Sequence, residues 1–512
     1  MEDYRSTEQS PKKEAEVARF PFQRQPPWIL SFLFAVQHVL VQTALLQTVH
    51  CLLIDALPSD QTARQHGYQF MATSLFASGI STLLQTTLGS RLPLVQAPSF
   101  EYLIPAITLV SSPTETNSSH HNVSLDQGQR GRSLNTSRSQ SSSCWSFTAS
   151  GTEPHTPERS HLPSLVSASW VRGAIVVSGI LQAFLGFSGL QGLVFRRCGP
   201  MVLAPMLSII GLSCYKEVAH FSSLHWGVTA LLVLQVMLLS QHLCSCHIPI
   251  CRWKRSKGFV VETYFPLFRI FSVWIADFPS GAMGFKGKGS PELLPGEWGA
   301  PTINVRSTYI GVIMALGTSI GSLGCYVMCA KVMGCLHPPR DAVNRGIFLE
   351  GLGSCIGAFL GGITATSSSV VNVGALALTQ AESRHSVQIA AVLCILLGMS
   401  AKLTYILTTI PAAVHGGVLS VTYTMAVSVG ISYFQYTNID SGRNIFIIGF
   451  TMFMALLTPH WFIRNPDYIV TGVESVDIFL MAVFMMPVIQ GGILAFLLDN
   501  TVTGELANIK KT

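Results

Sequence analysis

The chain has 512 residues and a formal net charge of +6, yet only 11% of its residues are charged and 49% are apolar. An average soluble protein carries roughly 25% charged residues, and this chain carries less than half of that share. The composition excludes a soluble enzyme, a nucleic-acid-binding protein and a disulfide-framed secreted domain. It predicts an all-α polytopic membrane protein, with membrane lipid around its spans and no nucleic acid as a partner.

Fourteen apolar stretches follow one another along the chain. Most are about 16 to 25 residues long, which is enough to cross a hydrocarbon layer of ~30 Å. Because residues 1–27 are polar and mixed in charge, we expect the first stretch to act as an uncleaved insertion signal. The predicted spans are 28–50, 68–88, 95–110, 170–190, 199–215, 224–243, 259–280, 307–331, 346–362, 371–380, 386–408, 412–434, 444–459 and 475–498.

Lys and Arg are unevenly distributed between the connecting loops, and this pattern predicts the topology. If the tail 1–27 is cytosolic, the basic cluster at 252–257 and the tail 499–512 are cytosolic too. The same assignment places the Ser/Thr-rich loop 111–165 and the loop 281–306 outside the cell. We therefore expect a multi-pass plasma-membrane protein with both termini in the cytosol. The long loop carries three expected N-glycosylation sites, Asn117, Asn122 and Asn135.

Two of the spans are irregular and occupy equivalent positions in the chain. The third, 95–110, contains two prolines, and the tenth, 371–380, is too short to cross and follows GGITATSSS. Each is third in a set of seven, so the halves 28–280 and 307–498 would form an inverted repeat. Paired broken segments in inverted halves mark the substrate site of many secondary transporters. The alternative is an unrelated Pro-kinked helix and a re-entrant loop.

Motifs in and around these segments are similar to those of one transporter family. They are Gln37-His38, QAPSFEYLIPA at 96–106, GP at 199–200, AP at 204–205, NRGIFLEGLGS at 344–354, TSSSVVNVG at 366–374, DSGRNIFIIGF at 440–450 and LLDNTVTG at 497–504. On these motifs the chain resembles the nucleobase–ascorbate transporters, solute carrier family 23, from Pro27 to Gly504. Within the family, SLGCY at 322–326 resembles the vertebrate member 3 branch.

The resemblance implies fourteen segments in a core domain (one to four and eight to eleven) and a gate domain (five to seven and twelve to fourteen). It implies a homodimer and secondary-active transport of a nucleobase-like or ascorbate-like small solute, with sodium or a proton as the possible coupling ion. The solute would lie between segments three, eight and ten, where short strands lead into half-helices whose free N–H groups can bind carbonyl oxygens. The residues implied at this site are Gln37, His38, Phe100, Tyr102, Gly321, Val371, Asn372, Gly374 and Thr379.

Departures from the family pattern leave a second interpretation open. The family's acidic residue in segment eight falls on Gly321, a second acid of the ascorbate branch falls on Cys325, and the outer positions of the segment-ten signature are Val371 and Gln380. Because a carboxylate at membrane depth is costly and is kept for function, its loss puts ion coupling in doubt. We expect weak or absent sodium-coupled nucleobase uptake, partly restored by Gly321→Glu. The alternative is a non-transporting or regulatory member that keeps the fold.

Three further interpretations rest on single features. Span 259–280 is interrupted by charged residues, but we keep it as a crossing because the cationic loops after it remain consistent with one. Cys51 and Cys144 are expected on the oxidising external side and are predicted to form a disulfide. The sequence contains no catalytic triad, phosphate-binding loop or metal-ligand motif, so we predict neither an enzyme nor a cofactor or metal site.

Overall fold

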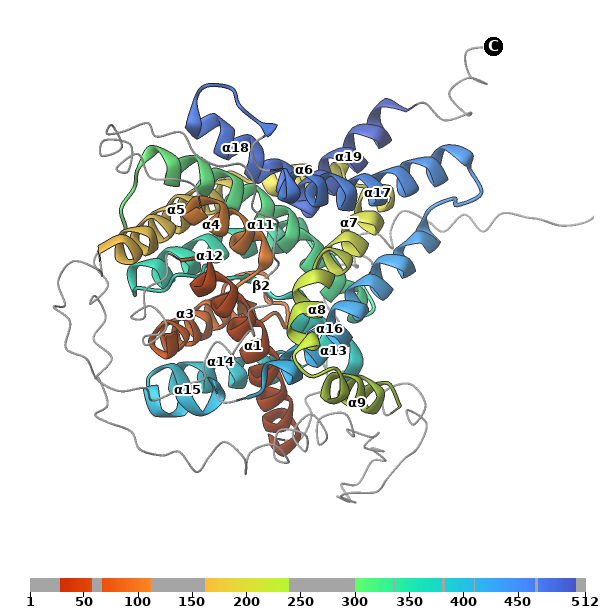
Figure 1. Cartoon of the computed structure of the whole chain (residues 1–512). Coiled ribbons are helices and arrows are strands. Elements are labelled where there is room, and N and C mark those ends of the chain that lie inside the picture. The colour runs from red at the N-terminus through yellow and green to blue at the C-terminus, as the bar shows by residue number, and fades with distance from the viewer. Residues whose placement is uncertain are drawn as a thin grey trace, which may run out of the picture.

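The computed structural model describes residues 28–57, 67–111, 162–238, 300–335, 337–379, 383–408, 410–465 and 468–502, and these ranges are almost entirely helical (Figure 1). The first half contains α1 (Trp28–Ala56), α3 (Gly67–Thr87), β1 (Gln96–Ala97), α4 (Phe100–Ser111), α5 (Leu162–Phe187), α6 (Leu190–Arg197), α7 (Pro200–Ser213), α8 (Tyr215–Ser223) and α9 (Trp226–Met237). The second half contains α11 (Val305–Val332), α12 (Arg340–Phe359), β2 (Ser367–Ser368), α13 (Val370–Thr379), α14 (Arg384–Gly398), α15 (Ala401–Thr408), α16 (Ala412–Tyr433), η5 (Phe434–Tyr436), α17 (Gly442–Arg464), α18 (Glu474–Met485) and α19 (Pro487–Thr501).

Every predicted span within the described ranges coincides with one or two of these helices, whereas span 259–280 lies outside them. Within the described part of the chain, six helices are long and apolar enough to cross a membrane, and the bent pair α18–α19 makes a seventh candidate. Four shorter apolar helices, α4, α9, α13 and α14, accompany them. The chain is therefore an integral multi-pass membrane protein.

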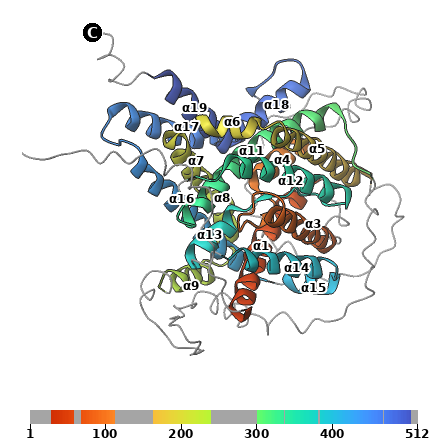
Figure 2. The same cartoon turned by 180° about the vertical axis from the view of Figure 1, so that it is seen from behind.

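The described helices pack in two groups; in both views α3, α5, α12 and α14 lie on one side of the molecule and α9, α16 and α17 on the other (Figures 1 and 2). The core group consists of α1, α3, α4, α5, α11, α12, α13 and α14, and α5 and α14 make its most extensive contacts. The gate group consists of α7, α8, α9, α16, α17 and α19, gathered around α7 and α16. The two groups meet chiefly where α13 and α1 contact α16 and where α11 contacts α7 and α19.

The contacts within the core group have a two-fold pattern. Helix α5 packs against α11 and α12, and α14 packs against α1 and α3, which are the equivalent helices of the other half. The two irregular segments are also equivalent, since each is a two-residue strand followed by a short helix. The strands pair antiparallel, with Gln96 opposite Ser368 and Ala97 opposite Ser367. Segments far apart in sequence thus meet at the centre of the core group.

Proline explains the backbone of the third segment. Pro98 disfavours the helical conformation in Ala97, so the chain enters α4 from an extended strand. Pro105 lies inside α4 and has no N–H to donate, so the carbonyl of Glu101 lacks its usual helical partner. The first turn of α4 is therefore left with unsatisfied backbone groups, and the protein interior has to accommodate them.

Several boundaries differ from the sequence-based prediction. The expected single span 475–498 is two helices bent by 76°, because Met486 precedes Pro487 and leaves the helical conformation there. The expected span 386–408 is divided into α14 and α15 after Gly398. Helix α5 begins at Leu162, so only residues 112–161 of the expected loop 111–165 lie outside the described residues.

The start of α11 is also earlier than expected, because Asn304 caps it. The Asn304 Oδ1 accepts a hydrogen bond from the backbone N–H of Ser307 at 2.7 Å, and the Asn304 N–H donates to Ser307 Oγ at 2.8 Å. This reciprocal capping box satisfies two N–H groups that a helix start otherwise leaves unpaired. The expected loop 281–306 therefore ends before α11, which begins at Val305.

Candidate functional site

A small cavity lies where the two strand–helix segments meet α11 and the gate group. Its volume is about 20 Å³, so it has room for about one or two water molecules in this conformation. The core group contributes Leu45, Pro98, Ser99, Phe100, Glu101, Thr318, Gly321, Ser322, Cys325, Ser367, Ser368, Ser369 and Val370, and the gate group contributes Ile210, Cys214 and Tyr423. Both groups therefore form its walls.

Two helix N-termini open onto this cavity. Helix α4 begins at Phe100 and α13 at Val370, and the residues just before and at each start line the cavity. Ser369 caps α13, since its Oγ accepts from the backbone N–H of Asn372 at 3.3 Å, whereas the buried Oγ of Ser99 has no hydrogen-bond partner. Free N–H groups and the helix dipole make such ends suited to carbonyl oxygens or other electronegative atoms.

Glu101 places a carboxylate in the cavity wall, directly opposite Gly321. A Cβ atom added to Gly321 would lie 3.0 Å from Glu101 Oε1 and 3.3 Å from its Cδ. Within the described ranges, no cationic side chain forms an ion pair with Glu101. The sequence analysis did not select Glu101, although a single acid inside an apolar segment is itself a signal for a functional site. The absent side chain at Gly321 makes room for this carboxylate.

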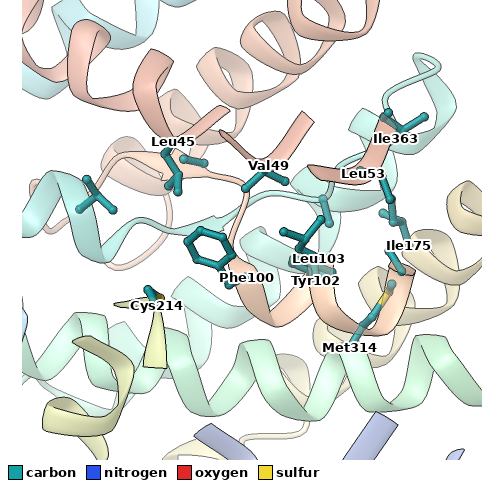
Figure 3. Packing of buried hydrophobic residues seen from close by; sticks show 14 of the residues in the cluster. Leu45, Val49, Leu53, Phe100, Tyr102, Leu103, Ile175, Cys214, Met314 and Ile363 are labelled. Carbon is teal, nitrogen blue, oxygen red and sulfur yellow. The ribbon is translucent and has the colours of Figure 1, made fainter. Parts of the chain in front are cut away.

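Phe100 supplies the flat apolar surface that was expected from the third segment. Its ring lies between Leu45 and Cys214 (Figure 3) and is tilted by 47° to the ring of Tyr423, with 6.1 Å between the ring centres. Tyr102 does not line this cavity, because it points toward α5 and donates to Gln182 Oε1 at 2.9 Å. Gln182 in turn donates to Thr318 Oγ1 at 2.5 Å, and Thr318 lines the cavity. Tyr102 therefore supports the cavity wall through Gln182.

A second carboxylate, Glu350 of α12, lies behind the cavity and is fully buried. It accepts hydrogen bonds from Ser322 Oγ at 2.5 Å, from the Tyr326 hydroxyl at 2.6 Å and from the Ser368 hydroxyl. Gln96 Nε2 lies 3.5 Å from the same carboxylate. Neutral donors thus satisfy Glu350 and fix the serines that line the cavity.

The other expected site residues lie outside this cavity. His38 Nδ1 donates to Asn372 Oδ1 at 3.1 Å, and Gln37 Nε2 lies 3.5 Å from the carbonyl oxygen of Ala375, so both connect α1 to α13. Val371 is fully buried in the first turn of α13. The Thr379 hydroxyl, at the end of α13, donates to the carbonyl of Ala375 at 2.9 Å.

Gly374 lies where α13 contacts α16. A Cβ atom there would be 2.4 Å from the backbone oxygen of Thr422, so only glycine permits this approach. Of the nine residues implied by the resemblance, Phe100 and Gly321 line the cavity. The remaining seven support the elements around it.

The predicted external sites are mostly outside the described residues, as Asn117, Asn122, Asn135 and Cys144 are. Cys51 is described, and it lies within α1 rather than beyond its end, with 4% of its surface exposed. The Cys51–Cys144 disulfide stays a prediction, because Cys144 lies outside the described residues.

The sequence relationships agree with this architecture. Residues 30–127 and 141–463 match the Permease family. Mouse solute carrier family 23 member 3 is 41% identical over 500 residues, covering 94% of this chain and 77% of the relative. The chain belongs to solute carrier family 23.

Other family members are more distant in sequence. Mouse solute carrier family 23 member 1 is 32% identical, covering 94% of this chain and 79% of the relative. The Arabidopsis thaliana nucleobase-ascorbate transporter 1 is 26% identical, covering 97% of this chain and 91% of the relative. The greater identity to member 3 supports the member 3 branch of solute carrier family 23.

The fold is also that of another transporter family. The murine solute carrier 26 family member A9 anion transporter, in its inward-facing state, superposes with a TM-score of 0.52 at 12% identity, covering 100% of this chain and 74% of that one. At this identity the likeness concerns the fold alone.

Proposed function

We propose that this member of solute carrier family 23 is a secondary transporter of a small nucleobase-like or ascorbate-like solute. The observation that carries the proposal is the cavity in which two half-helix N-termini meet and whose walls come from both helix groups. A site between two groups can open to either side as one group moves against the other, which is the usual geometry of alternating access.

The chemistry of the walls fits a flat, polar solute. Phe100 and Tyr423 offer aromatic surface, the starts of α4 and α13 offer donors, and Glu101 offers an acceptor. Because the cavity holds about 20 Å³, no heterocycle fits until the core and gate groups separate. The conformation described is therefore a closed one, and solute entry requires movement at the α13–α16 and α11–α7 contacts.

A non-transporting or regulatory role remains the second candidate, and Gly321 is the observation that favours it. The family acid in segment eight is absent at this position. Glu101 counts against this candidate, because its carboxylate occupies the space opposite Gly321 and the cavity thus keeps an acidic group. On balance this arrangement supports transport, with sodium or a proton as coupling ion.

Our proposal includes the membrane arrangement. Fourteen segments cross the plasma membrane, both termini are cytosolic, and the loop 111–165 is external and glycosylated at Asn117, Asn122 and Asn135. The exposed apolar face of α17, which includes Phe446, Phe450, Phe453 and Trp461, is available to lipid or to the second subunit of a homodimer. Glycosidase treatment of protein from mammalian cells is expected to increase its electrophoretic mobility, and an unchanged mobility would contradict this topology.

Uptake by reconstituted vesicles tests the function. Purified protein in proteoliposomes is supplied with labelled adenine, guanine, uracil or ascorbate, under sodium gradients, proton gradients or neither. We expect saturable uptake of at least one of these solutes over protein-free vesicles, and its gradient dependence identifies the coupling ion. Absence of uptake of all four, by protein that is monodisperse and folded, would favour the non-transporting alternative.

A further inference from the structure

We propose that Glu101 is the specificity-determining group of this cavity: it binds neutral planar solutes through their N–H donors and excludes anionic solutes such as ascorbate. The inference rests on the proposed transport function and deepens it, because it separates the two solute classes that the family contains. It depends on the carboxylate of Glu101, on its capacity to accept further hydrogen bonds and on the shape of the cavity.

Among the described residues that line the cavity, Glu101 is the only one with an acidic or basic side chain. Of the residues that line the cavity, all but Glu101 are apolar or neutral polar groups such as Thr318, Ser322 and Ser369. In the described part of the chain, no Lys or Arg faces this cavity to offset the carboxylate. An anion bound there would meet a like charge in a medium of low dielectric constant, where repulsion is strong.

The free acceptor capacity also lies on Glu101 rather than on Glu350. Ser322, Ser368 and Tyr326 already donate to the Glu350 carboxylate, which is fully buried behind the wall. Glu101 is only partly buried, faces the cavity and forms no ion pair with any described residue. A carboxylate with unused lone pairs in an apolar site is suited to a ligand that brings N–H donors.

The groups beside Glu101 supply the complementary half of the recognition. Ser99, two residues earlier and immediately before α4, has a buried hydroxyl with no hydrogen-bond partner, and Gly321 leaves the carboxylate uncovered on the opposite side. The Glu101 carboxylate, an acceptor, and the Ser99 hydroxyl, a donor, thus lie next to each other at the start of α4. An N–H group beside a carbonyl, as on the edge of a nucleobase, pairs with this arrangement, and Phe100 can stack on the ring.

Glu101→Gln tests the proposal, because the amide keeps the shape of the side chain and removes its charge. Glu217→Gln is the matched control, since Glu217 lies in α8, is partly buried and does not line the cavity. Each protein is purified, and equilibrium binding of labelled adenine, uracil and ascorbate is measured together with uptake into proteoliposomes.

The unmodified protein is expected to bind adenine or uracil and to discriminate against ascorbate by about 100-fold or more. Glu101→Gln is expected to weaken nucleobase binding by about 10- to 100-fold and to reduce the discrimination against ascorbate, whereas Glu217→Gln leaves both unchanged. If Glu101→Gln does not fold, the preference of the unmodified protein between uracil and ascorbate still decides the question.

The outcomes separate this inference from the proposed function. Ascorbate uptake without nucleobase binding would overturn the role of Glu101 and keep the transporter assignment. If nucleobase uptake is the same in Glu101→Gln and in the unmodified protein, the role of Glu101 is likewise overturned and the transporter assignment is kept. Absence of both binding and uptake for every solute would overturn the two together.

Discussion

Gly321 and Glu101 face each other across a gap in which an added Cβ atom would contact the Glu101 carboxylate tightly. Their separation, 3.0 Å from the Gly321 Cβ position to Glu101 Oε1, is below the ordinary contact distance of a methyl group. From the sequence, an acid at position 321 is expected to restore part of the sodium-coupled nucleobase uptake. The structure favours a different outcome, because the added acid would lie against the carboxylate of Glu101.

We predict that Gly321→Glu destabilises the protein instead of activating it. Overpacking costs about 1–3 kcal/mol, and a second buried carboxylate adds like-charge repulsion. The double variant Glu101→Ala/Gly321→Glu moves the acid across the gap, and it should recover most of the stability lost by the single change. Thermal unfolding of detergent-extracted protein measures the stability of the single and the double variant. If Gly321→Glu is as stable as the unmodified chain, the close approach of Gly321 to Glu101 is contradicted.

Only part of the site could be predicted from the sequence. Phe100 and Gly321 were identified because each belongs to a motif with a known place in the family. Glu101 was missed because a position-by-position comparison with the family shows only that segment eight has lost its acid at Gly321. The carboxylate that lies beside Gly321 comes from segment three instead. Compensation between residues that are 220 positions apart becomes visible only when the two helices are placed together.

At the scale of helices, the contact between α13 and α16 connects the core group to the gate group. Gly374 lets the two backbones approach, and the nearest atom to its absent Cβ is the carbonyl oxygen of Thr422, at 2.4 Å. A backbone oxygen cannot move aside as the end of a flexible side chain can. Any substitution at Gly374 must therefore separate the two helices.

Gly374→Ala is predicted to lower stability by about 1–3 kcal/mol, because the added methyl group forces α13 away from α16. Gly449→Ala in α17 is the control, since no atom lies within 4 Å of its Cβ position. Midpoints of thermal unfolding compare the two variants. Equal midpoints would mean that the α13–α16 contact tolerates a side chain.

His38 and Asn372 connect α1 to the start of α13 through one buried hydrogen bond of 3.1 Å. Asn372→Ala leaves the imidazole without this partner, which costs about 1–3 kcal/mol of stability. Because neither side chain lines the cavity, the affinity of the folded fraction for its solute should change less than in Glu101→Gln. A larger loss of affinity than of stability would instead assign Asn372 to the solute.

The apolar periodicity was sufficient to locate the helices but not their breaks. Spans such as 307–331 were predicted within two residues at each end, because α11 (Val305–Val332) is apolar throughout. The bend between α18 and α19 was missed although Pro487 marks it, because the hydropathy continues unchanged across the break. The pairing of Gln96 with Ser368 was beyond prediction from either half alone, since each strand has two residues and exists only through the other.

For the whole molecule, transport requires the core and gate groups to part on one side at a time. Besides the helix contacts, the side chain of Lys331 reaches the gate group from the end of α11. Lys331 Nζ lies 2.5 Å from the hydroxyl oxygen of Tyr436 and 4.4 Å from the centre of its ring. Tyr436 belongs to η5, which continues α16 of the gate group. Because Lys331 lies in the last turn of α11, at the end that the charge pattern predicts to be cytosolic, this contact would close the cytosolic side.

We predict that Lys331→Met shifts the protein toward a conformation open to the cytosol. An exposed cation–π contact contributes about 0.5–1 kcal/mol, so its loss changes the balance of two states by roughly two- to fivefold. Cys325 is a native reporter, since it lines the cavity and is 1% exposed in the closed conformation. In inside-out vesicles, a small thiol reagent should label Cys325 about two- to fivefold faster in Lys331→Met than in the unmodified protein. Peptide mass spectrometry measures the labelling rate. Lys331→Arg keeps the charge and should label at nearly the original rate, whereas equal rates in all three proteins would show that Lys331 does not hold the two groups together.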